Sequence, residues 1–86
     1  MSNLLEATST GTAVPTPSVL HSVVLTAGAD AASVVLRDAS GGPALLTLKA
    51  AANASVVWQS SKGVLFGTEI HAIFTGASPL AYIEYS

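Results

Sequence analysis

The sequence predicts an all-β fold: a single antiparallel β-sandwich or jelly-roll-like domain of about eight short strands. Short runs rich in Val, Leu, Ile and Thr are separated by Gly, Pro, Asn, Asp and Ser at intervals of roughly ten residues. Apolar and polar residues alternate in several of these runs, and helix signals are nearly absent. With 86 residues, the chain is long enough for one domain.

The expected strands follow one another in chain order, each bounded by turn residues. They are Ala13-Val14 with part of the preceding Thr-rich stretch, Val19–Thr26, Ser33–Asp38, Ala44–Ala50, Ser55–Gln59, Val64–Phe66, Glu69–Thr75 and Leu80–Tyr85. The turn after Ala44–Ala50 is expected to hold Asn53 near the left-handed region. Residues 1–18, which end in Pro15-Thr16-Pro17, are expected to form an extended N-terminal arm. The sandwich domain is then residues 19–86.

Composition indicates that the chain associates with other subunits. Only 9% of the residues are charged and 50% are hydrophobic, so the surface of one small domain offers few polar positions. Several strands, such as the one around Val56-Val57-Trp58, place apolar side chains on both faces. An antiparallel sheet usually meets water on one face, so we expect the second face to meet another subunit. With no cysteine and two histidines, a disulfide or metal framework is not expected to supply the missing stability.

Several classes of function are not expected. Arg37, Lys49 and Lys62 are the only Lys or Arg residues, and the net charge is −2, so no basic stripe exists for nucleic acid. The sequence contains no run of about 20 apolar residues, so a membrane-spanning helix is not predicted. The chain lacks a nucleotide-binding glycine motif and a G-x-S-x-G nucleophile motif, so we predict no enzyme activity and no cofactor.

A metal site is also not expected. It would have to combine the two imidazoles with carboxylates from separate strands, and no recognisable ligand spacing is present. The acids considered for this role are Asp30, Asp38, Glu69 and Glu84. As a carboxylate pair for acid–base glycoside chemistry, Glu69 and Glu84 would approach each other if their strands paired. We interpret them instead as solvated positions that discourage aggregation of strand edges.

The candidate interface residues are aromatic side chains and histidines, because aromatic residues anchor both cores and interfaces. We predict Phe66 and Phe74 to be core residues. The candidates for an oligomer interface are Trp58, Tyr82, Tyr85, His21 and His71. For the first three, the core edge and a subunit contact remain open alternatives. The two histidines would confer pH sensitivity if they faced each other across a trimer axis.

From about Ser22 to Tyr85, the order of four short sequence segments resembles that found in small virion structural proteins of tailed phages. The segments are Val23-Val24-Leu25-Thr26-Ala27-Gly28-Ala29-Asp30-Ala31-Ala32, Val34-Val35-Leu36-Arg37-Asp38, Leu48-Lys49-Ala50-Ala51-Ala52-Asn53-Ala54-Ser55-Val56 and Thr75-Gly76-Ala77-Ser78-Pro79. The resemblance covers about three quarters of the chain. It implies a capsid cement or decoration protein of the sandwich or jelly-roll type.

The function expected from this resemblance is mechanical. A homotrimer would sit on the virion surface, bind the major capsid protein at capsomer junctions and stabilise the phage head. The alternative is a phage tail or fibre module that binds a host-surface glycan or another tail protein. No catalytic, cofactor or metal-binding residue is implied by either expectation.

Overall fold

The structure, a computed structural model, describes residues 3–86, and these form eight strands without a helix. The strands are β1 (Asn3–Ala7), β2 (Gly11–Val14), β3 (Ser18–Thr26), β4 (Ala32–Arg37), β5 (Ala44–Ala50), β6 (Ser55–Phe66), β7 (Ile70–Thr75) and β8 (Leu80–Tyr85). All of their pairings are antiparallel. The predicted all-β sandwich of about eight strands is therefore confirmed.

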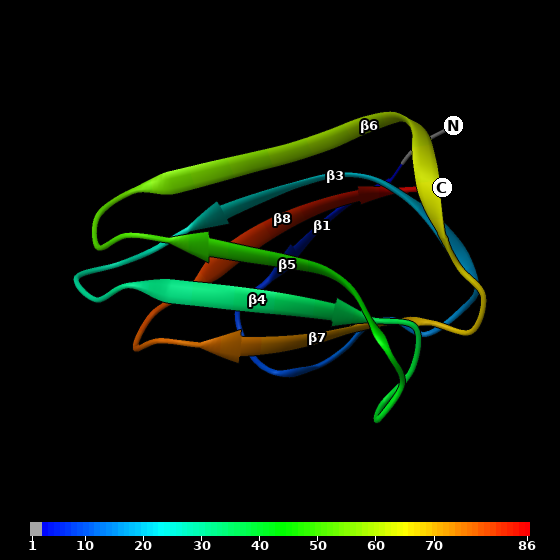
Figure 1. Cartoon of the computed structure of the whole chain (residues 1–86), viewed down its shortest axis with the longest axis horizontal. Coiled ribbons are helices and arrows are strands. Elements are labelled where there is room, and N and C mark those ends of the chain that lie inside the picture. Colours follow the sequence, from blue (N-terminus) through cyan, green and yellow to red (C-terminus); the bar gives the residue numbers. More distant parts are fainter. Residues whose placement is uncertain (1–2) are drawn as a thin grey trace.

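The strands form two sheets of four (Figure 1). We call β1-β8-β3-β6 sheet A and β2-β7-β4-β5 sheet B. Apart from the consecutive strands β4 and β5, neighbours in each sheet are distant in sequence, and the chain crosses between the sheets at all the other connections. This order is that of an eight-stranded jelly roll. Four strands lie at sheet edges, namely β1 and β6 in sheet A and β2 and β5 in sheet B.

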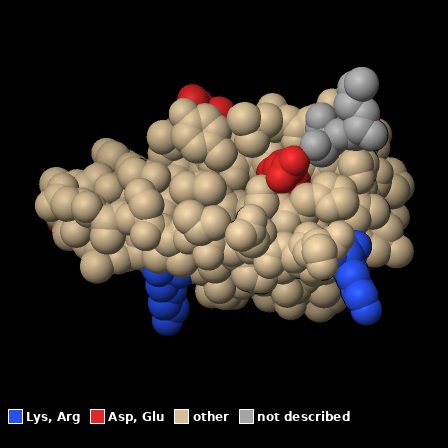
Figure 2. Space-filling model, turned by 90° about the horizontal axis from the view of Figure 1, so that it is seen from above, with Lys and Arg blue, Asp and Glu red and all other residues tan. Residues whose placement is uncertain are grey.

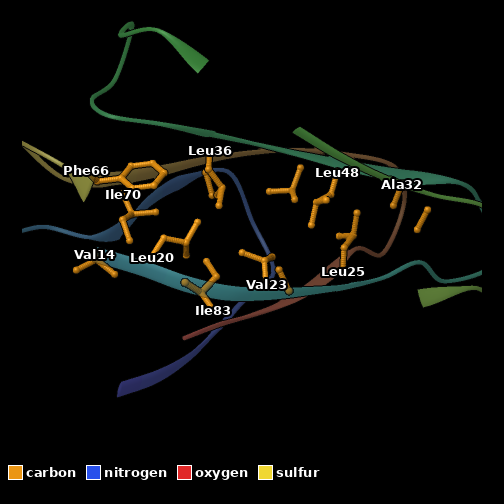
Figure 3. Packing of buried hydrophobic residues seen from close by; sticks show 14 of the residues in the cluster. Val14, Leu20, Val23, Leu25, Ala32, Leu36, Leu48, Phe66, Ile70 and Ile83 are labelled. Carbon is orange, nitrogen blue, oxygen red and sulfur yellow. The ribbon is translucent and has the colours of Figure 1, made fainter. Parts of the chain in front are cut away.

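The core lies between the sheets, and both contribute side chains to it (Figure 3). Its largest fully buried members include Phe66, Leu20 and Ile83 from sheet A, with Leu36 and Ile70 from sheet B. The alternation in β4, where every second residue is buried, directs one face of that strand inward. At about 2–3 kcal/mol for each large side chain removed from water, these residues supply most of the driving force for folding.

The N-terminal stretch differs from the arm expected over residues 1–18. Residues 3–7 and 11–14 are strands of the sandwich, in sheets A and B, rather than a segment that precedes it. Residues 1 and 2 of the expected arm lie outside the described residues. Residues 3–7 form a strand because their backbone pairs with β8, from Asn3↔Tyr85 to Ala7↔Ala81. Amino-acid composition does not indicate such backbone pairing, because every residue carries the same backbone N–H and C=O groups.

Strand β6 also differs from expectation, because Ser55–Gln59 and Val64–Phe66 belong to one twelve-residue strand. The residues between them were expected to form a turn. They instead bulge opposite His21, since β3 advances from Leu20 to Ser22 while β6 recedes from Val64 to Gln59. A bulge bends a strand without ending it, and Figure 1 shows β6 curving at this point.

Gly63 makes this bend possible. Its φ is 79°, and a Cβ at this position would lie 2.4 Å from Val19 Cγ1 and 3.2 Å from the Leu20 carbonyl oxygen. A side chain would be strained by both the backbone conformation and the contact. The Gly63 N–H also donates to Ser60 Oγ at 3.2 Å. Asn53 adopts a φ of 60°, in the left-handed region where the sequence placed it.

Candidate functional site

The exposed large hydrophobic side chains of the described chain gather on the edge strands. They are Leu4 on β1, Leu45 on β5, Val57 and Leu65 on β6, and Tyr82 on β8. Only the last lies on a central strand. Natural sheets usually protect their edges with charges, prolines or a covering segment, because an edge presents unpaired N–H and C=O groups. With apolar side chains exposed at four edge positions, these strands carry little of that protection.

The clearest such edge is the straight half of β6, Ser55–Gln59. It pairs with β3 on one side, from Ser22↔Gln59 to Thr26↔Ser55, and no strand of the described residues lies on the other. Val57 points away from the core and is 62% exposed, whereas Val56 and Trp58 point inward and pack against the core. Both the backbone and one apolar side chain of this half are available to a partner.

The opposite edge of sheet A is β1, which has five residues, as has the straight half of β6. Leu4 is 72% exposed, and Leu5 packs partly against the core. Glu6 lies opposite Tyr82 of β8. The hydrogen bond between their side chains and the negative charge of the carboxylate raise the pKa of Tyr82, with a smaller contribution from desolvation.

The edges of the two sheets coincide on the two narrow sides of the sandwich. β5 and β6 are consecutive and in contact, and β1 and β2 are joined by three residues. Lys49 and Lys62 are exposed on the β5/β6 side, and Glu6 is exposed on the β1/β2 side. In Figure 2, which is seen from above relative to Figure 1, the basic side chains in view project from the lower long edge of the picture, and the acidic ones lie at its middle and upper edge. The two narrow sides differ in charge sign because one carries Lys49 and Lys62 and the other carries Glu6.

A polar hollow of about 330 Å³ lies where β6 bulges. It is lined by His21, Ser22, Gln59, Ser60, Ser61 and Glu84. His21 Nε2 is 2.8 Å from Ser86 Oγ, and Ser22 Oγ donates to Glu84 Oε1 at 3.0 Å. These contacts hold β3 to the end of β8, beside the bulged residues of β6, so we interpret the hollow as a structural feature.

His71 lies in the other sheet, in a network centred on Glu69. The Glu69 carboxylate accepts the Thr12 hydroxyl and the Ser40 N–H, each at 3.2 Å. His71 Nδ1 is 3.9 Å from Glu69 Oε1, which is too far for a hydrogen bond, and this buried nitrogen has no other hydrogen-bond partner. The network ties β2 and the β4–β5 turn to β7, which is a structural role.

The five interface candidates from the sequence do not form one surface. Trp58 and Tyr85 are partly buried against the core, and Tyr82 faces outward from sheet A. His21 lies in sheet A and His71 in sheet B. Their role in an interface stays a prediction. Sequence reasoning missed the exposed edge residues, although Val57 belonged to a strand already noted for having two apolar faces.

Other kinds of site find little support in residues 3–86. No group of three or more His, Asp or Glu side chains in that range could hold a metal ion. Within the same range, no helix is long and apolar enough to cross a membrane. The fold and its surface define a small jelly-roll sandwich with uncovered apolar edges.

Comparison with known proteins places this fold among solved structures. No protein-family model and no curated protein matches the chain. The chain is similar to a structure of the Bacillus endospore appendages, a family of disulfide-linked pili, with 15% identity and a TM-score of 0.52 over 100% of this chain and 85% of that one. It is also similar to the crystal structure of PirA, with 19% identity and a TM-score of 0.53 over 99% and 84%. At these identities, the likeness shows a shared fold.

The expectation of a tailed-phage capsid cement protein is therefore wrong. The structural similarity leads to a bacterial spore appendage and to PirA, not to a phage capsid protein. The correction extends to the homotrimer bound to a major capsid protein, the virion location and the phage tail or fibre alternative. The physical reason is that Ala-, Gly-, Thr- and Val-rich phrases satisfy the needs of any small β-domain, so they carry information on fold but none on partner.

Proposed function

We propose that this protein is a structural subunit that polymerises with copies of itself through the edges of its two sheets, as the subunit of a fibrous, pilus-type assembly. The observation that carries the proposal is that, within residues 3–86, four of the five exposed large hydrophobic side chains lie on edge strands. The similarity to a protein of disulfide-linked pili supports the same class of function. The proposal assigns the protein no catalytic activity.

The assembly would be held without disulfides, because the chain contains no cysteine. Strand addition supplies main-chain hydrogen bonds, each with a net value of about 1 kcal/mol. A five-residue edge then contributes on the order of 5 kcal/mol, whereas association costs at least about 4 kcal/mol in lost freedom. One paired edge is marginal on its own. Apolar burial and a second paired edge on the same side therefore have to contribute.

The proposal is tested by sedimentation velocity and negative-stain electron microscopy over a range of protein concentrations. The wild type should form polymers. Val57→Lys should suppress them, because a lysine on an edge strand opposes strand addition. Thr75→Lys is the control: it places the same charge at an exposed position at the end of central strand β7, and it should leave polymerisation intact.

Circular dichroism melting should show that both variants retain the wild-type fold. A wild type that stays monomeric at every concentration would overturn the proposal. Loss of polymers in Thr75→Lys but not in Val57→Lys would move the interface away from the β6 edge.

A further inference from the structure

The directions of the strands determine how a second copy can extend the sheets. In sheet A each strand is antiparallel to its neighbour, and because there are four, the edge strands β1 and β6 run in opposite directions. The same holds for β2 and β5 in sheet B. A second copy translated within the plane of the sheets therefore places its β1 antiparallel to β6 of the first copy. The same translation places its β2 antiparallel to β5 of the first copy.

We propose that the copies dock head to tail, with the β1/β2 side of one copy against the β5/β6 side of the next. This inference rests on the proposed function, and it specifies which edges meet. It uses two edges in each contact, which meets the need for more than one paired strand. The partner of each edge is a second copy of this chain.

Charge opposes the symmetric pairing of β1 with β1. That pairing, centred on Leu5, would bring the Glu6 side chains of the two copies close together. Like charges within about 8 Å, the Debye length at physiological salt, repel each other with little screening. The head-to-tail contact instead sets the side that carries Glu6 against the side that carries Lys49 and Lys62.

The pattern of inward and outward side chains selects a register for β1 against β6. Leu4 points outward and Leu5 inward on β1, while Val57 points outward and Val56 inward on β6. Placing Leu4 beside Val57 of the next copy also places Leu5 beside Val56. Both apolar pairs then lie on matching faces, and a slip of one residue would set outward side chains against inward ones.

A head-to-tail contact is heterologous, so it does not close on itself after two copies. Each added copy presents a new β5/β6 side, and the product is an open filament or a ring, depending on the rotation between copies. A symmetric β6-to-β6 contact would instead stop at two copies unless the β1/β2 sides also paired with each other. The head-to-tail contact therefore gives a polymer from a single kind of interface.

Site-directed cross-linking tests the inference, and the absence of native cysteine leaves no background reaction. Leu4→Cys and Val57→Cys are prepared singly, mixed at equal amounts, allowed to assemble and treated with a short bifunctional maleimide. The mixture should give several times more covalent dimer than either variant alone. The control is Thr75→Cys, an exposed position at the end of central strand β7, which should give no dimer with Val57→Cys.

Sedimentation before cross-linking separates the two proposals. If no polymer forms, the proposed function fails. If polymers form but Val57→Cys alone cross-links as efficiently as the mixture, copies meet β6 to β6 and the head-to-tail inference is overturned. Polymers that give no dimer between positions 4 and 57 would also overturn it while leaving the proposed function in place.

Discussion

Central and edge strands of this sandwich use their apolar residues differently. In β4, a central strand, buried and half-buried residues alternate without interruption, and each buried side chain meets the core. In β1 and the straight half of β6, the residues that face outward include Leu4 and Val57, which are largely exposed. Leucine and valine thus serve folding in one place, and we propose that they serve assembly in the other. The amino-acid composition of the chain does not distinguish these two uses of leucine and valine.

The largest effect that would test this difference comes from a matched pair of leucine truncations. Leu36→Ala on β4 removes a side chain with no exposed surface, and it should lower the free energy of unfolding by about 2–5 kcal/mol. Leu4→Ala on β1 removes one that is 72% exposed, and its effect should stay within about 0.5 kcal/mol. Urea unfolding measures both, in the Val57→Lys background so that assembly does not add to stability.

An equal loss of unfolding free energy in the two variants would show that Leu4 contributes to folding as Leu36 does. A large loss of polymer in Leu4→Ala without the lysine background, at unchanged monomer stability, would show that Leu4 contributes to assembly.

A second, smaller effect concerns the bend that separates the two halves of β6. Gly63 and Gly41 have almost the same φ, 79° and 80°, but a Cβ at Gly41 meets nothing within 4 Å. Gly41→Ala should therefore report the backbone strain alone, about 1 kcal/mol. Gly63→Ala should cost at least about 1 kcal/mol more, because its Cβ would contact Val19.

Thermal unfolding of the two glycine variants provides the comparison. Equal melting temperatures would mean that β6 shifts freely around its bulge, and that its straight half is not held in place by the core. A larger loss in Gly63→Ala would show that the edge offered for assembly depends on a fixed bend.

The sequence predicted the strands whose ends are marked by turn residues. Ala44–Ala50 follows Pro43, Leu80–Tyr85 follows Pro79, and both have the bounds that were expected. The bulge in β6 was read as a turn because turns and bulges draw on the same residues, here Ser, Lys and Gly. β1 was missed because Leu4-Leu5 is a short apolar pair without alternation, and only its pairing with β8 makes it a strand.

The candidate site was less predictable than the fold. Apolar residues on two faces of a strand correctly drew attention to Val57, but which strands lie at an edge depends on sheet order, which no local pattern encodes. The same holds for Lys62 and Glu6, whose positions on opposite sides follow from the topology. The phage assignment is wrong because residues that are common in the strands of many β-domains are not evidence of a shared binding partner.

The smallest expected effect concerns the contact that joins the edge strand β1 to central strand β8. The Glu6 carboxylate raises the pKa of Tyr82 above its ordinary value of 10.0, chiefly through their side-chain hydrogen bond and then through charge. Because the pKa of Tyr82 is higher in the folded protein, the contact favours folding below pH 10. This contribution is lost as the pH rises through the raised value.

Absorbance titration of tyrosinate in a Tyr85→Phe background observes Tyr82 alone, since the chain has two tyrosines. Glu6→Gln should lower the midpoint by removing the charge, and Glu6→Ala should lower it further by also removing the hydrogen-bond acceptor. The order should be Glu, Gln, Ala from highest to lowest. An unchanged midpoint in Glu6→Ala would show that β1 is not held against β8 at this position. The β1 edge that we propose for docking would then be mobile in the free subunit rather than already ordered for strand pairing.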